Sequence, residues 1–229
     1  MKKVAILQSN YLPWKGYFDL IAYVDEFIIY DDMQYTNRDW RNRNMIKTPN
    51  GLLWLSIPVG TNTKRTIREV LISEKDWRNK HCQNLKSNYQ KSPFFDEVYL
   101  IISDIILDDN INSLSELNIS LINAICNYLH IETKISYCWD YGLIDGKTER
   151  LVDLCQKANA SVYVSGPSAK NYIDEQLFKS KNIQLEWFNY EGYQEYPQLW
   201  GDFTHSVSIL DLLFNCGKYA YKYMRYVHD

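Results

Sequence analysis

The sequence predicts an α/β fold in which a mostly parallel sheet is flanked by helices. Short apolar runs alternate with amphipathic segments along most of the chain, which is the pattern of such folds. Residues 3–8 and 26–30 contain continuous apolar runs typical of buried parallel strands, and residues 16–24 between them have helical spacing. Two parallel strands joined by a helix nearly always form a right-handed crossover. We therefore expect a sheet assembled from such crossover units.

The whole chain is expected to form one domain. Its 229 residues are ample to bury a substantial core. It contains no linker rich in glycine, serine or proline and no internal repeat. We expect a single α/β domain over residues 1–229, whose first half, 1–130, carries a helical insertion at about 74–130. The second half, 131–229, then completes the sheet.

The segment after the first unit combines loops and strands. Residues 31–51 are polar and basic and end in a turn signal, Asn50-Gly51, so they are expected to form a loop. Residues 52–59 follow as an apolar strand. The alternation of polar and apolar side chains in residues 66–73 predicts a further strand.

Helical patterns dominate the next part of the chain. Ser73 is suited to be the N-cap of a long helix that extends to Ser92, before Pro93. Residues 94–107 fit either a helix or a strand. Residues 113–131 carry leucine and isoleucine at three- and four-residue spacing, which predicts a helix.

The second half returns to alternating strands and helices. Apolar runs predict strands at residues 134–138, 161–165 and 183–190. The expected helical segments are residues 148–160 with Thr148 as N-cap, a turn and helix within 166–182, and a final helix over 206–224 that breaks near Gly217.

Composition excludes several classes of protein. No stretch approaches the ~20 uninterrupted apolar residues of a membrane span, and the N-terminal apolar run is too short for a signal peptide, so we expect a cytoplasmic protein. The five cysteines are scattered without a C-x-x-C pair, which argues against a disulfide framework and a metal site. A net charge of −3 does not favour a general nucleic-acid-binding surface. The 19 tyrosines and seven tryptophans suit sugar and nucleotide pockets, or simply a tyrosine-rich core.

The loop after the first strand is the first candidate site, because ligands of open α/β sheets bind beyond the carboxyl ends of strands. It combines amide side chains with aromatic ring faces, and its candidate substrate-binding residues are Gln8, Asn10, Tyr11, Trp14 and Tyr17. Gly16 lies where the next helix begins, and free backbone N–H groups there favour an anion. The alternative is that these aromatic residues plug the core at the end of the strand.

The start of this helix is loosely similar to nucleotidyl-transfer-type α/β folds. Those folds place a His-x-Gly-His pair at the same point, where this chain has Trp14-Lys15-Gly16-Tyr17. The histidines that contact phosphates are missing, so the analogy concerns the fold and is no evidence of adenylation.

Two carboxylates end the second strand. Asp31 and Asp32 are adjacent, and adjacent strand residues point to opposite sides, so they cannot both serve one site. Either can bind a sugar hydroxyl, a substrate amine or a metal. We take Asp32 as a candidate catalytic residue and Asp31 as a candidate substrate ligand. An acidic turn without a functional role is the alternative.

The basic segment that follows is a candidate anion receptor. Arg38, Arg41 and Arg43 surround Trp40, and guanidinium groups match the geometry of phosphates and carboxylates. The candidate substrate-binding residues of this segment are Arg41, Asn42, Arg43 and Lys47. A solvated loop is the alternative.

The loops of the second half supply further candidates. Ser165, Gly166 and Ser168 follow a strand and open a helix, a position suited to an oxyanion, although the spacing is not that of a Walker loop. Gln198 lies in front of the last helix and is a further candidate ligand.

Only two of the four histidines are candidates for proton transfer. His81 lies within the predicted long helix and His205 precedes the last one. An imidazole near its ordinary pKa can accept a proton at neutral pH, so both are candidate catalytic residues. A lone histidine on a helix more often has a structural role. No Ser-His-Asp order, H-x-x-x-D or H-E-x-x-H signature is present.

Several segments together resemble the WbqC-like protein family from end to end. The matching residues are Gln8–Tyr17, Tyr30–Tyr35, Arg41–Thr48, Ser165–Ser168, Tyr172, Tyr196–Trp200 and Ser208–Leu213. The family usually has His-Gln-Pro or Gln-Pro at its opening motif, where this chain has Leu7-Gln8-Ser9. The substitution removes a stiffening proline and a potential acid–base group.

The resemblance implies a role in bacterial surface polysaccharide biosynthesis of the O-antigen type. It implies a transferase that N-acylates, or aminoacylates, the amino group of a nucleotide-linked aminodeoxysugar. The partner is then the nucleotide-linked sugar, and the co-substrate is an acyl or aminoacyl donor whose identity is open. Nucleic acid enters only as an aminoacyl carrier, and a homo-oligomer is an open possibility.

A binding protein of the same pathway is the alternative. The enzyme reading predicts that Gln8, Tyr11, Asp32, Arg41, Arg43 and Ser168 line one cleft beside a proton acceptor. A carrier or assembly factor has the same pocket without a proton acceptor, or a large exposed aromatic patch.

Overall fold

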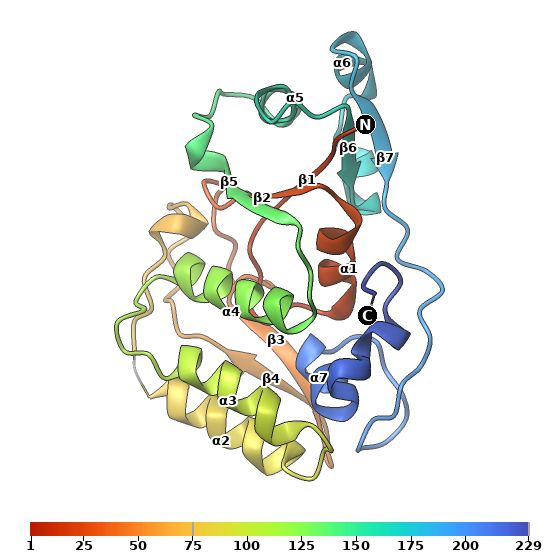
Figure 1. Ribbon diagram of the computed structural model, residues 1–229. Coiled ribbons are helices and arrows are strands. Elements are labelled where there is room, and N and C mark those ends of the chain that lie inside the picture. The colour runs from red at the N-terminus through yellow and green to blue at the C-terminus, as the bar shows by residue number, and fades with distance from the viewer. Residues whose placement is uncertain (75, 229) are drawn as a thin grey trace.

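A five-stranded parallel sheet forms the centre of the molecule. The computed structural model describes residues 1–74 and 76–228 (Figure 1). The sheet has the order β5-β2-β1-β6-β7, and every neighbouring pair is parallel. Its strands are β1 (Lys3–Leu7), β2 (Glu26–Ile29), β5 (Lys134–Tyr137), β6 (Val162–Ser165) and β7 (Gln184–Trp187). The predicted α/β class with a mostly parallel sheet is confirmed.

The strand order reverses once, beside the first strand. The chain proceeds outward from β1 to β2 and β5, and then returns to place β6 on the other side of β1. The crossover loops that leave β1 and β6 therefore diverge. In open α/β sheets such a divergence opens a crevice at the carboxyl ends of the two strands.

Both faces of the sheet are buried, which explains the continuous apolar runs. Ala5 packs into one core and its neighbours Val4 and Ile6 into another, because successive strand residues point to opposite faces. Helices α1 (Lys15–Tyr23) and α4 (Leu114–Tyr128) cover the first face. Helices α5 (Thr148–Lys157) and α6 (Glu175–Ser180) cover the second (Figure 1).

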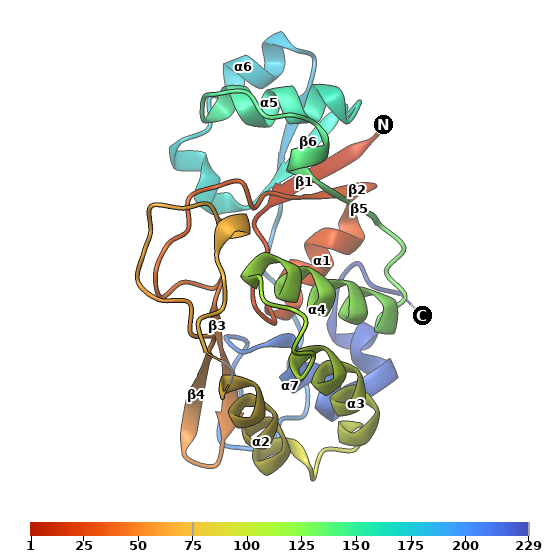
Figure 2. The same cartoon turned by 90° about the vertical axis from the view of Figure 1, so that its left-hand side faces the viewer.

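A β-hairpin lies outside the central sheet and corrects part of the prediction. Strand β3 (Arg43–Thr48) pairs antiparallel with β4 (Gly51–Ser56), and the two form their own sheet (Figure 2). The expectation of a loop over residues 43–48 was wrong. Asn44 and Ile46 are buried between partly exposed Arg43 and Met45, but buried Lys47 breaks the alternation and the polar residues of this strand hide it.

The strand predicted over residues 66–73 is also absent. Residues Ile67–Glu69 form a short 3₁₀ turn, η1. The carboxylate of Glu69 accepts a hydrogen bond of 2.8 Å from the backbone N–H of Thr66, which favours a turn over a strand. In place of a strand, two residues of this segment form isolated antiparallel β-bridges, Thr66 with Gln34 and Leu71 with Ser113.

The predicted insertion contains three helices. Helix α2 (Trp77–Tyr89) follows Asp76, and α3 (Phe95–Ile106) resolves the ambiguous segment as a helix. The long helix does not begin at Ser73, whose hydroxyl donates to the carbonyl of Pro58 over 2.9 Å; Lys75 lies outside the described residues. No helix among the described residues is long and apolar enough to cross a membrane.

The last helix returns to the insertion. Helix α7 (Ile209–Cys216) packs against α3 and β3, and it ends at Gly217, where a left-handed φ of 51° starts a 3₁₀ segment, η4 (Gly217–Tyr223). The predicted break near Gly217 is confirmed. Figures 1 and 2 show α2, α3, α7 and the hairpin gathered at one end of the molecule, below the parallel sheet.

Candidate functional site

The loop of residues 8–14 is fixed by elements that lie far away in the sequence. Asn44 of β3 donates its amide to the carbonyls of Tyr11 (3.2 Å) and Leu12 (2.8 Å). The carbonyl of Pro13 accepts a hydrogen bond of 2.9 Å from the N–H of Ile209, at the start of α7. The loop is therefore held between the hairpin and the last helix.

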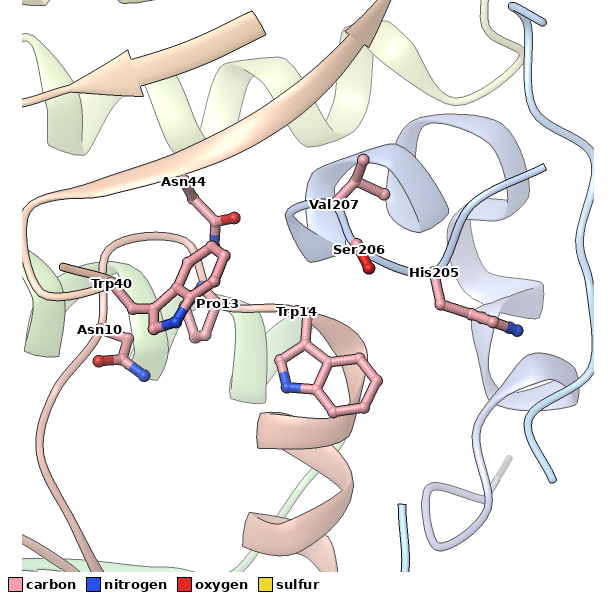
Figure 3. A pocket seen from close by; sticks show the side chains of 8 residues that line it. All are labelled: Asn10, Pro13, Trp14, Trp40, Asn44, His205, Ser206 and Val207. Carbon is pink, nitrogen blue, oxygen red and sulfur yellow. The ribbon is translucent and has the colours of Figure 1, made fainter. Parts of the chain in front are cut away.

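One side of this loop lines a pocket of about 310 Å³, which we call the tryptophan pocket. Its lining residues are Asn10, Pro13, Trp14, Trp40, Asn44, His205, Ser206 and Val207 (Figure 3). They come from the first loop, the basic segment, β3 and the segment before α7. Two indole rings thus stand beside amide, imidazole and hydroxyl groups.

Two polar atoms of this pocket have no hydrogen-bond partner among residues 1–74 and 76–228. They are Oδ1 of Asn10 and Nδ1 of His205, and both atoms are buried. Buried polar atoms are almost always paired, so an unpaired atom calls for an explanation. Both residues line the same cavity, and a ligand with polar groups that reached the two atoms would satisfy them.

His205 is held in its neutral form. Partial burial lowers the pKa of His205, and the positive charge of Lys15 lowers it further. Lys15 is itself buried, where its ammonium donates to the carbonyl of Gln194 and lies 4.9 Å from the ring centres of Tyr193 and Tyr196. Burial lowers the pKa of Lys15 to about 8. A neutral imidazole in a cavity can accept a proton from a substrate.

A second pocket of about 390 Å³ lies where the strand order reverses, and we call it the switch-point pocket. Its floor is mainly aliphatic, and its polar and aromatic lining residues are Gln8, Tyr30, Lys147, Tyr163, Ser165, Ser168 and Tyr172. Gly166 also lines it. Gln8 and the three residues Ser165, Gly166 and Ser168 thus meet, from the loops after β1 and β6.

The two pockets are neighbours separated by a thin wall. Gln8 lines the switch-point pocket and Asn10, two residues later, lines the tryptophan pocket. The ring of Tyr190 lies 5.4 Å from that of Trp14, and a Cβ at Gly166 would lie 3.7 Å from Tyr190. The predicted single cleft is in fact two hollows on either side of one loop.

Tyr11 and His81 do not face either pocket. Both are buried, and the Tyr11 hydroxyl lies 2.8 Å from Nδ1 of His81. Trp77 of α2 packs edge-on against both rings. Burial lowers the pKa of His81 to about 4, so this histidine stays neutral inside the core. The assignments of Tyr11 to a ligand and His81 to proton transfer are therefore corrected to structural roles.

Tyr17 and the space above Gly16 also belong to the core. The Tyr17 hydroxyl donates to the carbonyl of Gln8 over 3.0 Å, and its ring packs against Phe27. A Cβ at Gly16 would overlap the Trp14 ring, which covers the start of α1. An anion has no access to this helix end, so that expectation is corrected.

The two aspartates have separate structural partners. Asp31 is fully buried and accepts hydrogen bonds from the N–H and hydroxyl of Ser9 (2.8 and 2.6 Å) and the hydroxyl of Ser115 (2.5 Å). Burial raises the pKa of Asp31, and these hydrogen bonds oppose the rise. Asp32 lies 3.7 Å from the guanidinium of Arg68. Neither carboxylate lines the tryptophan pocket or the pocket where the strand order reverses.

Most of the predicted anion receptor is engaged within the protein. The Arg41 guanidinium pairs with Asp39 at 2.9 Å, and the amide of Asn42 donates to a backbone carbonyl at 3.0 Å. The Lys47 ammonium donates to Oε1 of Gln198 at 2.8 Å, so these two candidates hold each other. Arg41, Asn42, Lys47 and Gln198 therefore have partners within the protein, and their role in anion binding stays a prediction.

Arg43 is the exception in the basic segment. Its guanidinium lies 4.1 Å from the ring centre of Trp54, and its Nε is buried without a hydrogen-bond partner in the described part of the chain. The ring of Trp54 in turn lies 5.5 Å from that of Trp40, at a tilt of 38°, and Trp40 lines the tryptophan pocket. Trp40 and Trp54 keep 44% and 40% of their surface exposed. This surface of Arg43, Trp40 and Trp54 continues the pocket outward.

Some lining residues escaped the sequence analysis. Asn44 and Ser206 line the tryptophan pocket, and Lys147 lines the switch-point pocket. The alternation of residues 43–48, once recognised as a strand, places Asn44 on the buried face. Among residues 1–74 and 76–228, no group of three or more histidine, cysteine, aspartate or glutamate side chains is arranged to hold a metal ion.

The protein is an α/β protein with a parallel sheet and two adjoining pockets near the ends of its strands, and open sheets of this class bind their ligands at such a topological switch point. The chain belongs to the WbqC-like protein family, which matches residues 8–223. It is 56% identical over 228 residues to a protein of Mycobacterium tuberculosis (strain ATCC 25618 / H37Rv) named "Uncharacterized protein Rv1507c", covering 99% of each chain. No solved structure matches the chain.

Proposed function

We propose that the protein is a cytoplasmic transferase that N-acylates, or aminoacylates, the amino group of a nucleotide-linked aminodeoxysugar. The pathway is bacterial surface polysaccharide biosynthesis of the O-antigen type. The observation that carries the proposal is the pair of unpartnered buried atoms, Oδ1 of Asn10 and Nδ1 of His205, in a cavity walled by two indole rings.

The dimensions and lining of the tryptophan pocket suit a sugar ring. Its volume of about 310 Å³ is at the small end of ligand pockets, which favours one monosaccharide unit. The faces of Trp14 and Trp40 offer apolar surface to the C–H groups of a sugar. The amide oxygen of Asn10 and the hydroxyl of Ser206 are available to amine and hydroxyl groups.

The proposed reaction uses His205 as general base. The sugar nitrogen attacks the carbonyl carbon of the donor, and a C–N bond forms while the bond between the acyl carbon and its carrier breaks. Neutral Nδ1 of His205 accepts the proton that the amine loses, and the resulting imidazolium returns a proton to the leaving carrier group. Oδ1 of Asn10 accepts a hydrogen bond from the amine and orients it.

A non-catalytic binding or assembly protein of the same pathway is the second candidate. It is favoured by the exposed ring contact between Trp40 and Trp54, which continues with exposed Leu52 along the hairpin. Exposed apolar groups that cluster in this way often mark an interaction surface. A partner transferase docked on the hairpin would then complete the active site beside the bound sugar.

Ligand binding and acyl transfer can be tested separately. Thermal-shift and calorimetric titrations compare nucleotide-linked sugars with a 3-amino, a 4-amino or a hydroxyl group, and we expect stabilisation by an aminosugar. Mass spectrometry then follows amide formation with acyl and aminoacyl donors. Stabilisation only by free nucleotides or RNA would refute the proposed substrate class.

Variants of the two unpartnered residues distinguish the enzyme from the binding protein. His205→Asn should abolish amide formation while sugar affinity changes less than about tenfold, because the base and not the binding surface is lost. His130→Asn, an exposed histidine at the end of α4 with a left-handed φ that asparagine tolerates, is the matched control. Full amide formation by His205→Asn would exclude the assigned base.

A further inference from the structure

The switch-point pocket has no ligand in the function proposed above. Its volume of about 390 Å³ exceeds that of the tryptophan pocket, which is about 310 Å³. Tyr190 and the loop of residues 8–14 separate the two, so an aminosugar in one does not fill the other. Its place between β1 and β6 is where open α/β sheets take their ligands.

Three polar side chains of this pocket are free to meet a ligand. Gln8, Lys147 and Ser168 line it, and none of their side chains has a hydrogen bond or ion pair within the described part of the chain. They come from three different loops, after β1, before α5 and after β6. An amide, an ammonium and a hydroxyl therefore converge on one cavity with their donors unused.

The remaining lining is apolar or aromatic. Leu151 and Ala169 are buried in the floor, and the ring of Tyr172 remains 59% exposed. A flat, partly apolar ligand can pack against such a ring while a charged part of it reaches the ammonium of Lys147. A nucleoside phosphate combines these two properties, because its base is planar and its phosphate is an anion.

The local sequence supports a phosphate contact for the lysine. Gly146-Lys147-Thr148 begins α5 and has the same residues as the end of a phosphate-binding loop, G-x-x-x-x-G-K-[ST], but Gly142 stands one position closer than in that motif. The Thr148 hydroxyl accepts a hydrogen bond from the N–H of Asp174 at 3.2 Å, and Thr148 does not line the switch-point pocket. Only the lysine is comparable with the motif.

The charges around the lysine are compatible with this assignment. Asp145, two residues before Lys147, lies 3.7 Å from the guanidinium of Arg150 and is partly neutralised by it. Glu149 is exposed on the first turn of α5, next to Gly146. Among the described residues, Arg150 thus pairs with Asp145, whereas the side chains of Lys147 and Glu149 have no ion pair.

We infer that the switch-point pocket binds the nucleoside phosphate part of a substrate, with its phosphate at Lys147 and Ser168 and its base beside Tyr172. The role of this nucleoside phosphate in the reaction rests on the proposed function. The nucleoside phosphate belongs either to the carrier of the aminosugar or to an activated acyl donor. In both cases the reacting group extends past Gln8 and Tyr190 to the tryptophan pocket.

Calorimetric titration tests the site directly. The probes are the four ribonucleoside diphosphates, thymidine diphosphate and inorganic pyrophosphate. We expect at least one nucleotide to bind, and Lys147→Ala to weaken it by about tenfold or more, because one charge-assisted hydrogen bond is lost. Tyr172→Ala should weaken nucleotides but leave pyrophosphate unchanged. Lys179→Ala, an exposed lysine on α6 outside the pocket, is the matched control and should bind like the wild type.

Two results overturn the inference. One is that no nucleotide binds to the wild type, and the other is that Lys147→Ala, with an unchanged circular dichroism spectrum, binds as tightly as the wild type. Failure of the proposed function gives a different result from failure of this inference. Nucleotides then bind to the wild type, but no sugar amide is formed under any condition.

A competition experiment identifies the source of the nucleotide. The protein is first saturated with the nucleotide that binds best and is then titrated with the nucleotide-linked aminosugar. Displacement of the nucleotide assigns the pocket to the sugar carrier, whereas a ternary complex assigns it to the donor. A Gln8→Leu variant tests the path between the pockets. An equal loss of affinity for the nucleotide and for the nucleotide-linked aminosugar would support a path that both ligands share.

Discussion

The buried pair of Tyr11 and His81 makes stability depend on pH in a predictable direction. Burial lowers the pKa of His81 from 6.5 to about 4, and a hydrogen bond to the backbone of Ser56 opposes this effect. In the unfolded chain the imidazole becomes protonated below about pH 6.5, whereas in the folded protein it stays neutral. The unfolded state therefore gains protons first, and His81 stabilises the fold less and less as pH falls from 6.5 to about 4.

The magnitude follows from the two pKa values. The difference between 6.5 and about 4 corresponds to a loss of roughly 3 kcal/mol in the free energy of unfolding across this range. That is a large part of the ~5–15 kcal/mol by which a typical domain is stable. The effect is absent above pH 6.5, where the imidazole is neutral in both states.

Urea denaturation measures this effect when wild type and His81→Gln are compared at several pH values between 4 and 7.5. Other buried acids titrate equally in both proteins, so the difference between the two curves isolates His81. His81→Gln should be less stable at pH 7, because it disturbs the hydrogen bond to Tyr11, and the gap should shrink or reverse towards pH 4. A gap that stays constant from pH 7 to pH 4 would refute a neutral, buried His81.

Three further perturbations have outcomes that follow from the geometry. Lys15→Met removes the charge that helps to lower the pKa of His205, so this pKa should rise towards its ordinary value, and the acid limb of the rate profile and the imidazole NMR titration should both move to higher pH. Asn44→Ala should cost about 1–3 kcal/mol in urea denaturation and weaken sugar binding, because two carbonyls of the loop 8–14 lose their donor. Gly217→Ala should lower the melting temperature through a cost of about 1–3 kcal/mol, because φ is 51° there and the new methyl group would overlap a phenylalanine ring; an unchanged melting temperature would contradict this strain.

The central sheet was predictable because its signal is local. Strands β1, β2 and β6 are short runs of apolar side chains buried on both faces, and each run is visible without knowledge of its neighbours. The hairpin was harder to predict from the sequence. In β3 the polar residues Arg43 and Lys47 obscure the alternation, and no local pattern says whether a strand joins the main sheet or pairs with the next one.

The site was predictable only in part, because burial depends on contacts distant in sequence. Asn10 and Trp14 do line a pocket, yet Tyr11 between them is buried because α2, more than sixty residues later, places Trp77 and His81 over it. The sequence of a loop after a strand does not show whether its tyrosine lines a pocket or is buried in the core. The pairing of Lys47 with a distant loop residue is equally invisible in the sequence.

The attachment of the first loop to the last helix has a consequence for biosynthesis of the chain. The segment of His205 to Val207, which closes the tryptophan pocket, is translated after all five strands of the central sheet. A nascent chain can therefore assemble its sheet on the ribosome while the pocket still lacks a wall. The tryptophan pocket is complete only once this segment has been synthesised and has folded against the loop of residues 8–14, so a complete pocket marks a later stage of maturation than the appearance of the sheet.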